Sequence, residues 1–176
     1  MIIARILHVT APAKIYARPV PPCLDVYVWV PEQSPEVFER FIDSYVNVDE
    51  PGDERLHAFT RVHVLGLADG ADDNTLDELR SKDGDDAFTL YLRARDLYQA
   101  MITVTRDGAT VLGLSMDAPD DLLETLRQAE QLVEQLRHEF SAPAGRAGVE
   151  LPPAGDRCEW HEEALVLLRT GELAAP

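Results

Sequence analysis

The sequence predicts a single α+β domain over residues 1–176, with a mostly antiparallel sheet, a three-strand meander and helices packed on one side. Three observations lead to this fold class. The stretch "LDVYVWVP" alternates in polarity, three strand-like stretches follow one another from "AFTLYLRAR" to "ATVLGLSM", and a long helix carries one apolar seam. With 176 residues, 45% of them hydrophobic, the chain is long enough to bury a core without disulfides.

The first expected strand covers residues 24–30. Its two faces differ: Leu24, Val26, Val28 and Val30 lie on one, and Asp25, Tyr27 and Trp29 lie on the other. The apolar face is predicted to be buried. Tyr27 and Trp29 are either an anchor for a partner or the second buried face of a central strand, and we favour burial because helices commonly cover such faces.

Three elements are expected next. "SPEVFERFIDSYV" predicts a helix with Ser34 as N-cap and Pro35 at its first position. "RLHAFTRVHVLG" returns to period two and predicts a strand over 56–65. Within the acidic stretch 68–87, Thr75 and Glu78 form a capping-box pattern that predicts a short helix.

The second half of the chain begins with three consecutive expected strands, "AFTLYLRAR", "YQAMITVT" and "ATVLGLSM". An Asp-Gly turn in "RDG" joins the last two. Asp117, with Asp120 in the first turn, is expected to cap a long core helix. The seam of that helix is Leu122, Leu126, Ala129, Val133, Leu136 and Phe140. Residues 141–157, rich in Ala, Pro and Gly, are predicted to be an irregular connector, and "EEALVLLR" to be a short strand or helix.

The net charge of the chain narrows the kinds of partner that it is expected to bind. Asp and Glu number 32 against 16 Lys and Arg, a formal net charge of −16. This charge disfavours direct binding to nucleic acids and anionic membranes, and it would speed encounter with a basic protein. Solubility is the more ordinary role of such a surface. The start "MIIARILHVT" lacks the apolar core of a signal peptide, so the sequence predicts a cytoplasmic protein.

Motifs for metals, cofactors and nucleophiles do not emerge from the sequence. Cys23 and Cys158 lie far apart and are expected to be free thiols. The acidic stretch lacks the alternating oxygen ligands of a calcium loop, and His161 lacks the second histidine of a zinc helix. No phosphate-binding glycine loop or nucleophile elbow is present. We therefore expect no metal, no cofactor and no catalytic residue, and an enzyme is the less favoured reading.

One group of residues stands out against the acidic background. If the strand expected at 56–65 neighboured the strand at 88–95, one sheet face would carry His57, Arg61, His63, Tyr91, Arg93 and Arg95. Such a face could bind an anionic ligand or support acid-base chemistry. The more ordinary explanation is a solvent-exposed face that balances nearby carboxylates.

In its general type the chain resembles bacterial toxin-immunity proteins. The resemblance lies in a small acidic α+β domain with the meander "AFTLYLRARDLYQAMITVTRDGATVLGLSMD" and no catalytic signature. It implies a protein that binds a basic toxin, often a nuclease, with acids that imitate phosphates. The expected partner-binding residues are Asp69, Asp72, Asp73, Asp77, Glu78, Asp83, Asp85 and Asp86, with Asp49, Glu50, Asp53 and Glu54 as further candidates. Two alternatives are a secretion chaperone or adaptor and a small enzyme or anionic-ligand sensor on the His/Arg face.

Overall fold

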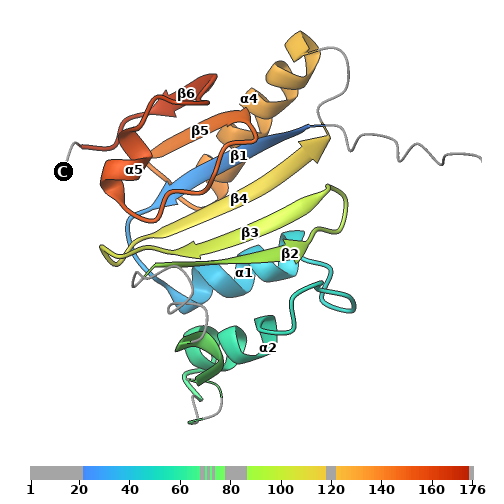
Figure 1. The fold of residues 1–176 in the computed structure, drawn as a ribbon, viewed down its shortest axis with the longest axis vertical. Helices are drawn as coiled ribbons and strands as arrows, with labels where there is room; N and C mark the ends of the chain where they lie inside the picture. Colours follow the sequence, from blue (N-terminus) through green and yellow to red (C-terminus); the bar gives the residue numbers. More distant parts are fainter. Residues whose placement is uncertain are drawn as a thin grey trace, which may run out of the picture.

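The structure is a computed structural model that describes residues 22–67, 70, 72, 74–77, 87–117 and 122–174. Six antiparallel strands form one sheet in the order β2-β3-β4-β1-β5-β6 (Figure 1). The strands are β1 (Cys23–Val30), β2 (Phe88–Arg93), β3 (Gln99–Val104), β4 (Thr110–Asp117), β5 (Ala144–Val149) and β6 (Leu168–Gly171). The helices are α1 (Pro35–Tyr45), α2 (Leu56–Phe59), the π-helical turn η1 (Thr60–Val64), α4 (Leu122–Glu139) and α5 (Arg157–His161). The α+β prediction is confirmed.

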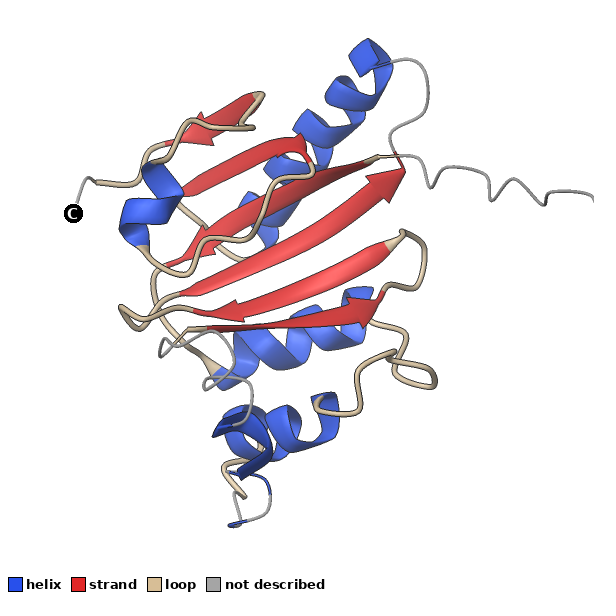
Figure 2. Cartoon of the chain, in the orientation of Figure 1, coloured by secondary structure: helices blue, strands red, loops and turns tan. Residues whose placement is uncertain are grey.

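Helices α1 and α4 cover one face of the sheet, which we call the inner face (Figure 2). The alternation in β1 sends its leucine and valines to this face, where they pack against Phe38 and Phe41 of α1. The predicted seam of α4 is confirmed as a core element, because Ala129, Val133 and Leu136 are buried in the same cluster. Apolar residues recur about every 3.6 positions in a helix and at every second position in a strand. Each element therefore has one apolar face, and these faces pack together in the core.

The meander is also confirmed. Strands β2, β3 and β4 pair in sequence, and Thr105 N–H donates to the Ala109 carbonyl at 3.1 Å across the "RDG" turn. On the other face of the sheet, the outer face, the register places Asp25 of β1 opposite Ser115 of β4, and Ser115 opposite Gln99 of β3. This row of polar side chains crosses three strands.

The strand predicted over 56–65 is wrong, because this stretch forms α2 and η1. Leu56, Phe59 and Val62 also fit a helical spacing, and a short apolar stretch cannot separate the two periods. Packing against α1 decides the outcome: the Phe59 ring meets the Phe38 ring edge to face, with 5.0 Å between centroids. A helix is present where the acidic stretch was expected to form one, with residues 70, 72 and 74–77 helical. Thr75 lies within this helix and not at its N-cap, which corrects the capping-box prediction, and Glu78 lies outside the described residues.

Two further boundaries differ from the predictions. Residues 144–149 form β5, next to β1 in the sheet, and not an irregular connector. The small residues of this tract serve close packing: a Cβ added at Gly148 would lie 1.9 Å from the Leu165 carbonyl oxygen. Asp117 is the last residue of β4, opposite Cys23, and residues 118–121, where the start of α4 would be capped, lie outside the described residues.

Candidate functional site

The C-terminal segment 150–161 crosses the outer face of the sheet and covers part of it (Figure 1). Leu151, Ala154 and Trp160 of this segment form a second core with Tyr27 and Trp29 of β1. The Trp29 and Trp160 rings meet edge to face at 5.4 Å. Burial of Tyr27 and Trp29 in a central strand is thereby confirmed, although an irregular segment with a one-turn helix provides the cover.

Arg146 of β5 holds this segment on the sheet. Its guanidinium donates to the carbonyls of Pro152 (3.2 Å), Glu159 (3.0 Å) and Trp160 (3.0 Å), and it lies 4.8 Å from the centroid of the Trp160 ring. Burial and the nearby Arg169 lower the pKa of Arg146 to about 10, so it stays protonated at neutral pH. The segment is therefore tied down at both of its ends by one buried cation.

Arg106, in the turn between β3 and β4, holds the middle of the same segment. It forms ion pairs with Asp156 and, at 2.7 Å, with Glu159, and its backbone N–H donates to the Gly155 carbonyl. These acids raise the pKa of Arg106. Asp156 also caps α5 by accepting from Glu159 N–H at 2.8 Å.

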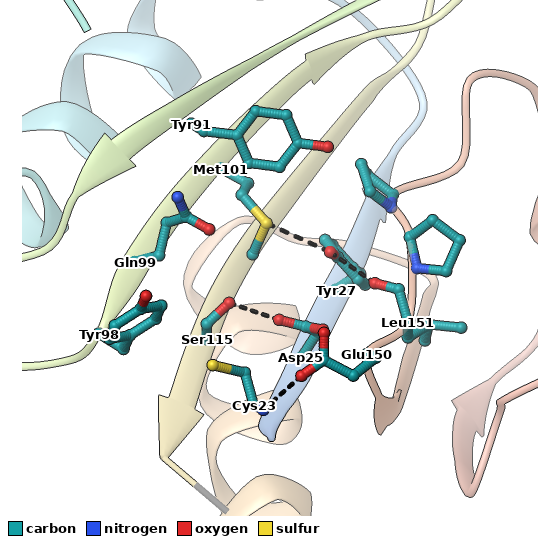
Figure 3. A pocket seen from close by; sticks show the side chains of 12 residues that line it. Cys23, Asp25, Tyr27, Tyr91, Tyr98, Gln99, Met101, Ser115, Glu150 and Leu151 are labelled. Atoms are coloured by element: carbon teal, nitrogen blue, oxygen red, sulfur yellow. Dashed lines mark hydrogen bonds between the residues drawn. The ribbon is translucent and has the colours of Figure 1, made fainter. Parts of the chain in front are cut away.

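Between segment 150–153 and strands β1 to β4, the outer face is hollowed by a pocket of about 500 Å³, which we call the Asp25 pocket (Figure 3). This volume lies within the range of roughly 300–1,000 Å³ typical of small-ligand sites. The pocket is lined by Cys23, Asp25, Tyr27, Tyr91, Tyr98, Gln99, Met101, Ser115, Glu150, Leu151, Pro152 and Pro153. Among these described lining residues there is no Lys, Arg or His.

Asp25 is a carboxylate in an apolar strand, and only 7% of it is exposed. The Ser115 hydroxyl and the Leu151 backbone N–H donate to it. Burial raises the pKa of Asp25 from 3.8 to about 6, and Glu150 raises it further against the opposing effect of the two hydrogen bonds. The charged side chain that acts on Asp25 is thus another acid, and the hydrogen bonds from Ser115 and Leu151 favour the ionised form of Asp25.

The floor and one wall of the pocket are held rigidly. The Tyr27 hydroxyl lies 2.9 Å from the Leu151 carbonyl, to which it donates, and 3.2 Å from Met101 Sδ. Glu150 Oε1 accepts from Cys23 N–H at 2.8 Å, which places this carboxylate at the pocket mouth (Figure 3). Burial, followed by Asp25 and Glu150, raises the pKa of the Cys23 thiol, so this cysteine lacks the thiolate character of a nucleophile.

The opposite wall is aromatic and open. Tyr91 and Tyr98 are 47% and 54% exposed, and both line the pocket. A second hollow of about 300 Å³ shares Tyr91, Pro152 and Pro153 with it, so the two hollows adjoin on the outer face. Tyrosine rings beside carboxylates can bind a cation through the ring faces and the charge together.

The acidic residues predicted to bind a partner lie only partly within the described residues. Asp72 is buried and forms an ion pair with Arg61 at 2.6 Å, and Asp77 is exposed in the turn at 74–77. Asp69, Asp73, Glu78, Asp83, Asp85 and Asp86 lie outside the described residues. Among the further candidates, Asp53 pairs with Arg55 at 2.6 Å and Glu50 pairs with Arg93.

The His/Arg sheet face does not form as expected, because three of its members are on helices. His57 is an exposed residue of α2, and Arg61 and His63 lie in η1. His63 stacks on Phe59 with 4.7 Å between ring centroids and packs near Phe38. It is therefore part of the aromatic packing around α1.

The other three members of that set lie on or after β2. Tyr91 belongs to the Asp25 pocket, Arg93 pairs with Glu50, and Arg95 Nε donates to the Val46 carbonyl at 3.0 Å. The structure thus engages both arginines in contacts that hold the loop after α1, and it separates them from Arg61 and the two histidines.

The sequence analysis missed the Asp25 pocket, although one signal was present. Asp25 interrupts an otherwise apolar strand and shares the face of Tyr27, which is an unusual place for a carboxylate. The partners Ser115 and Gln99 follow from strand register, and Glu150 comes from a segment that was expected to be irregular. Without the strand order β3-β4-β1, these residues cannot be brought together from sequence.

Gly113 of β4 sets the position of the pocket floor, and its replacement gives a first prediction. A Cβ at this position would lie 2.4 Å from the Tyr27 ring. Gly113→Ala is therefore expected to lower the free energy of unfolding by about 1–3 kcal/mol, since the buried ring cannot move without strain. Urea denaturation measures the change, with Gly70→Ala as the control because no atom of the described residues lies within 4 Å of the added carbon. Equal stability of the two variants would contradict the close approach.

Comparison with family models, with curated proteins and with solved structures gives no match to this chain. Within the described part of the chain, no helix combines the length and apolarity needed to cross a membrane. Within the same residues, no group of three or more His, Cys, Asp or Glu side chains is placed to hold a metal ion. The Asp25 pocket is therefore interpreted from its own geometry and charge.

Proposed function

We propose that this chain is a non-enzymatic, acidic protein-binding module whose partner is a basic protein. The observation that carries the proposal is the Asp25 pocket: its described lining combines two acids and three tyrosines without a basic side chain, in a chain of net charge −16. A basic surface is the complement that such a face prefers.

The shape of the outer face supports protein binding. Tyrosines are enriched at the energetically important positions of interfaces, because they bury a large ring and still offer a hydroxyl. Tyr91 and Tyr98 present such rings beside a groove that segment 150–153 borders with two prolines. The scaffold beneath is a paired sheet, so a partner would meet a preorganised surface.

The specific form that we propose is a bacterial immunity protein, acting in the cytoplasm, that neutralises a cognate toxin by covering its basic active site. Carboxylates on the module would take the positions of substrate phosphates. The exposed acids of the 69–86 stretch, among them Asp77, are proposed as a further contact surface. Strong net charge would also raise the rate of encounter with a positively charged toxin.

The test uses purified protein and the basic protein encoded next to its gene. We expect a complex whose affinity falls by about tenfold or more between roughly 0.1 M and 1 M salt, because the Debye length shortens from about 10 Å to about 3 Å. Isothermal titration calorimetry measures the affinity at each salt concentration. An affinity that does not change with salt, or no complex with any basic neighbour, would overturn the proposal.

The second candidate is a secretion chaperone or adaptor. The two adjoining hollows along segment 150–155 favour it, because neighbouring hollows can hold successive side chains of an extended segment. The two candidates differ in the state of the partner. Binding that persists with an unfolded fragment of the partner supports the chaperone, and binding that needs the folded partner supports the immunity protein.

A further inference from the structure

We propose that the Asp25 pocket binds the guanidinium group of an arginine side chain that the basic partner supplies. This inference rests on the proposed function, because the arginine belongs to the partner. It adds the residue type that is recognised and the atoms that recognise it. The argument rests on a buried acid, an aromatic wall and the cost of burying each kind of cation.

Asp25 is a buried carboxylate in a pocket whose described lining contains no basic side chain. Burying a charge is costly unless an opposite charge accompanies it. Asp25 is as buried as a core residue and receives hydrogen bonds from Ser115 and the Leu151 N–H, yet its charged neighbour is Glu150. A cation that enters the pocket would meet Asp25 at its floor and Glu150 at its mouth, where both carboxylates face the cavity (Figure 3).

The second step concerns the aromatic wall. Tyr91 and Tyr98 line the side of the pocket opposite segment 150–153, and the Gln99 side chain lies between them (Figure 3). A cation near a tyrosine ring is attracted to the ring face, and the attraction grows where water is excluded. The pocket therefore provides carboxylates on one side and ring faces on the other, together with an amide oxygen.

The third step distinguishes arginine from lysine. A guanidinium is planar, stacks on aromatic rings and can bridge two carboxylates through its fork of donors. It is also less strongly hydrated than an ammonium, so it loses less on entering a site where the acid is buried. Both properties suit a site where two carboxylates, Asp25 and Glu150, lie near tyrosine rings. They favour arginine as the occupant.

The test is an NMR titration of the isotopically labelled protein with N-acetyl-arginine methylamide. This probe carries the side-chain charge and no charged termini. We expect binding with a dissociation constant on the order of 1 mM, and shifts centred on Cys23, Asp25, Gln99 and Glu150. The citrulline analogue has the same shape without the charge, and the lysine analogue has the charge without the planar group. Both are expected to bind at least several-fold more weakly.

Two variants locate the site. Asp25→Asn removes the buried charge and should weaken binding of the arginine probe by about tenfold. Gln99→Lys places a resident ammonium in the pocket and should abolish binding by occupying it. Their matched controls are Asp43→Asn on α1 and Gln131→Lys on α4, which make the same changes at exposed positions on helices of the inner face. Amide spectra verify that each variant is folded.

Several outcomes overturn the inference. These are equal binding of the citrulline probe, equal binding of the lysine probe, shifts spread over exposed acids elsewhere, or unchanged affinity in both Asp25→Asn and Gln99→Lys. Failure here is separable from failure of the proposed function. A salt-dependent complex with the basic partner that is unaffected by both variants leaves the function standing without this site, and probe binding without any partner leaves the site standing without that function.

Discussion

Replacing Trp160 with alanine is expected to lower the free energy of unfolding by about 3–5 kcal/mol. Trp160 is 2% exposed, its ring meets the Trp29 ring at 5.4 Å, and the Arg146 guanidinium lies 4.8 Å from its centroid. The substitution leaves a large cavity between segment 150–161 and the sheet. It also removes the ring on which the Arg146 guanidinium stacks. The backbone carbonyls that accept hydrogen bonds from Arg146 are expected to shift as well.

Urea denaturation followed by far-ultraviolet circular dichroism measures this loss. Leu165→Ala is the control, because Leu165 is a nearby large residue whose side chain is mainly exposed. Trp160→Phe, which keeps an aromatic ring, should lie between the wild type and the alanine variant. A loss below about 1 kcal/mol for Trp160→Ala would mean that segment 150–161 does not depend on the second core.

The second prediction is that Asp25→Asn stabilises the protein at pH 7.5, by about 1–3 kcal/mol. The pKa of Asp25 is about 6 in the folded protein, above its ordinary value of 3.8. Below about pH 3 the carboxyl is protonated in both states and has no effect. Between pH 3.8 and about pH 6 the unfolded chain has released this proton while the folded protein retains it, so stability falls as the pH rises. The destabilisation is complete at about pH 7, where the carboxyl is ionised in both states.

Asparagine keeps the shape of the side chain and still accepts from Ser115 and the Leu151 N–H, but it carries no charge. We therefore expect the stability difference between Asp25→Asn and the wild type to be near zero at about pH 3 and to grow up to about pH 7. Urea denaturation over this pH range measures it, and Asp43→Asn, an exposed carboxylate on α1, serves as the matched control. A difference that stays constant with pH would contradict the burial of an unpaired charge at Asp25.

These two predictions describe opposite contributions to one site. Trp160 and Arg146 stabilise segment 150–161 and so hold the wall of the Asp25 pocket, whereas Asp25 on its floor opposes folding. Residues that weaken a fold at a preorganised cavity are typical of binding sites, where the missing counterpart arrives with the ligand. This cost is the physical reason for assigning the pocket to a cationic partner.

Particular residues show why some of the fold is readable in the sequence. The alternation around Val26 and Val28 has a single interpretation because seven consecutive residues obey it, and the Asp107-Gly108 turn joins β3 to β4, its antiparallel neighbour. The stretch from Leu56 to Val64 fits both a strand and a helix, and contact with Phe38 selects the helix. The tract around Gly145 and Gly148 resembles a linker in composition, and only close packing identifies it as a strand.

By itself, the sequence determined the fold class, the inner core and the acidity that points to a basic partner, because each depends on local period or on composition. The tertiary structure alone decided where the site lies. Asp25, Ser115, Gln99 and Glu150 come from four segments, and strand order, register and the crossing of segment 150–161 bring them to one pocket. Such long-range pairings leave no periodic trace in the chain, so the site becomes visible only when the sheet is assembled.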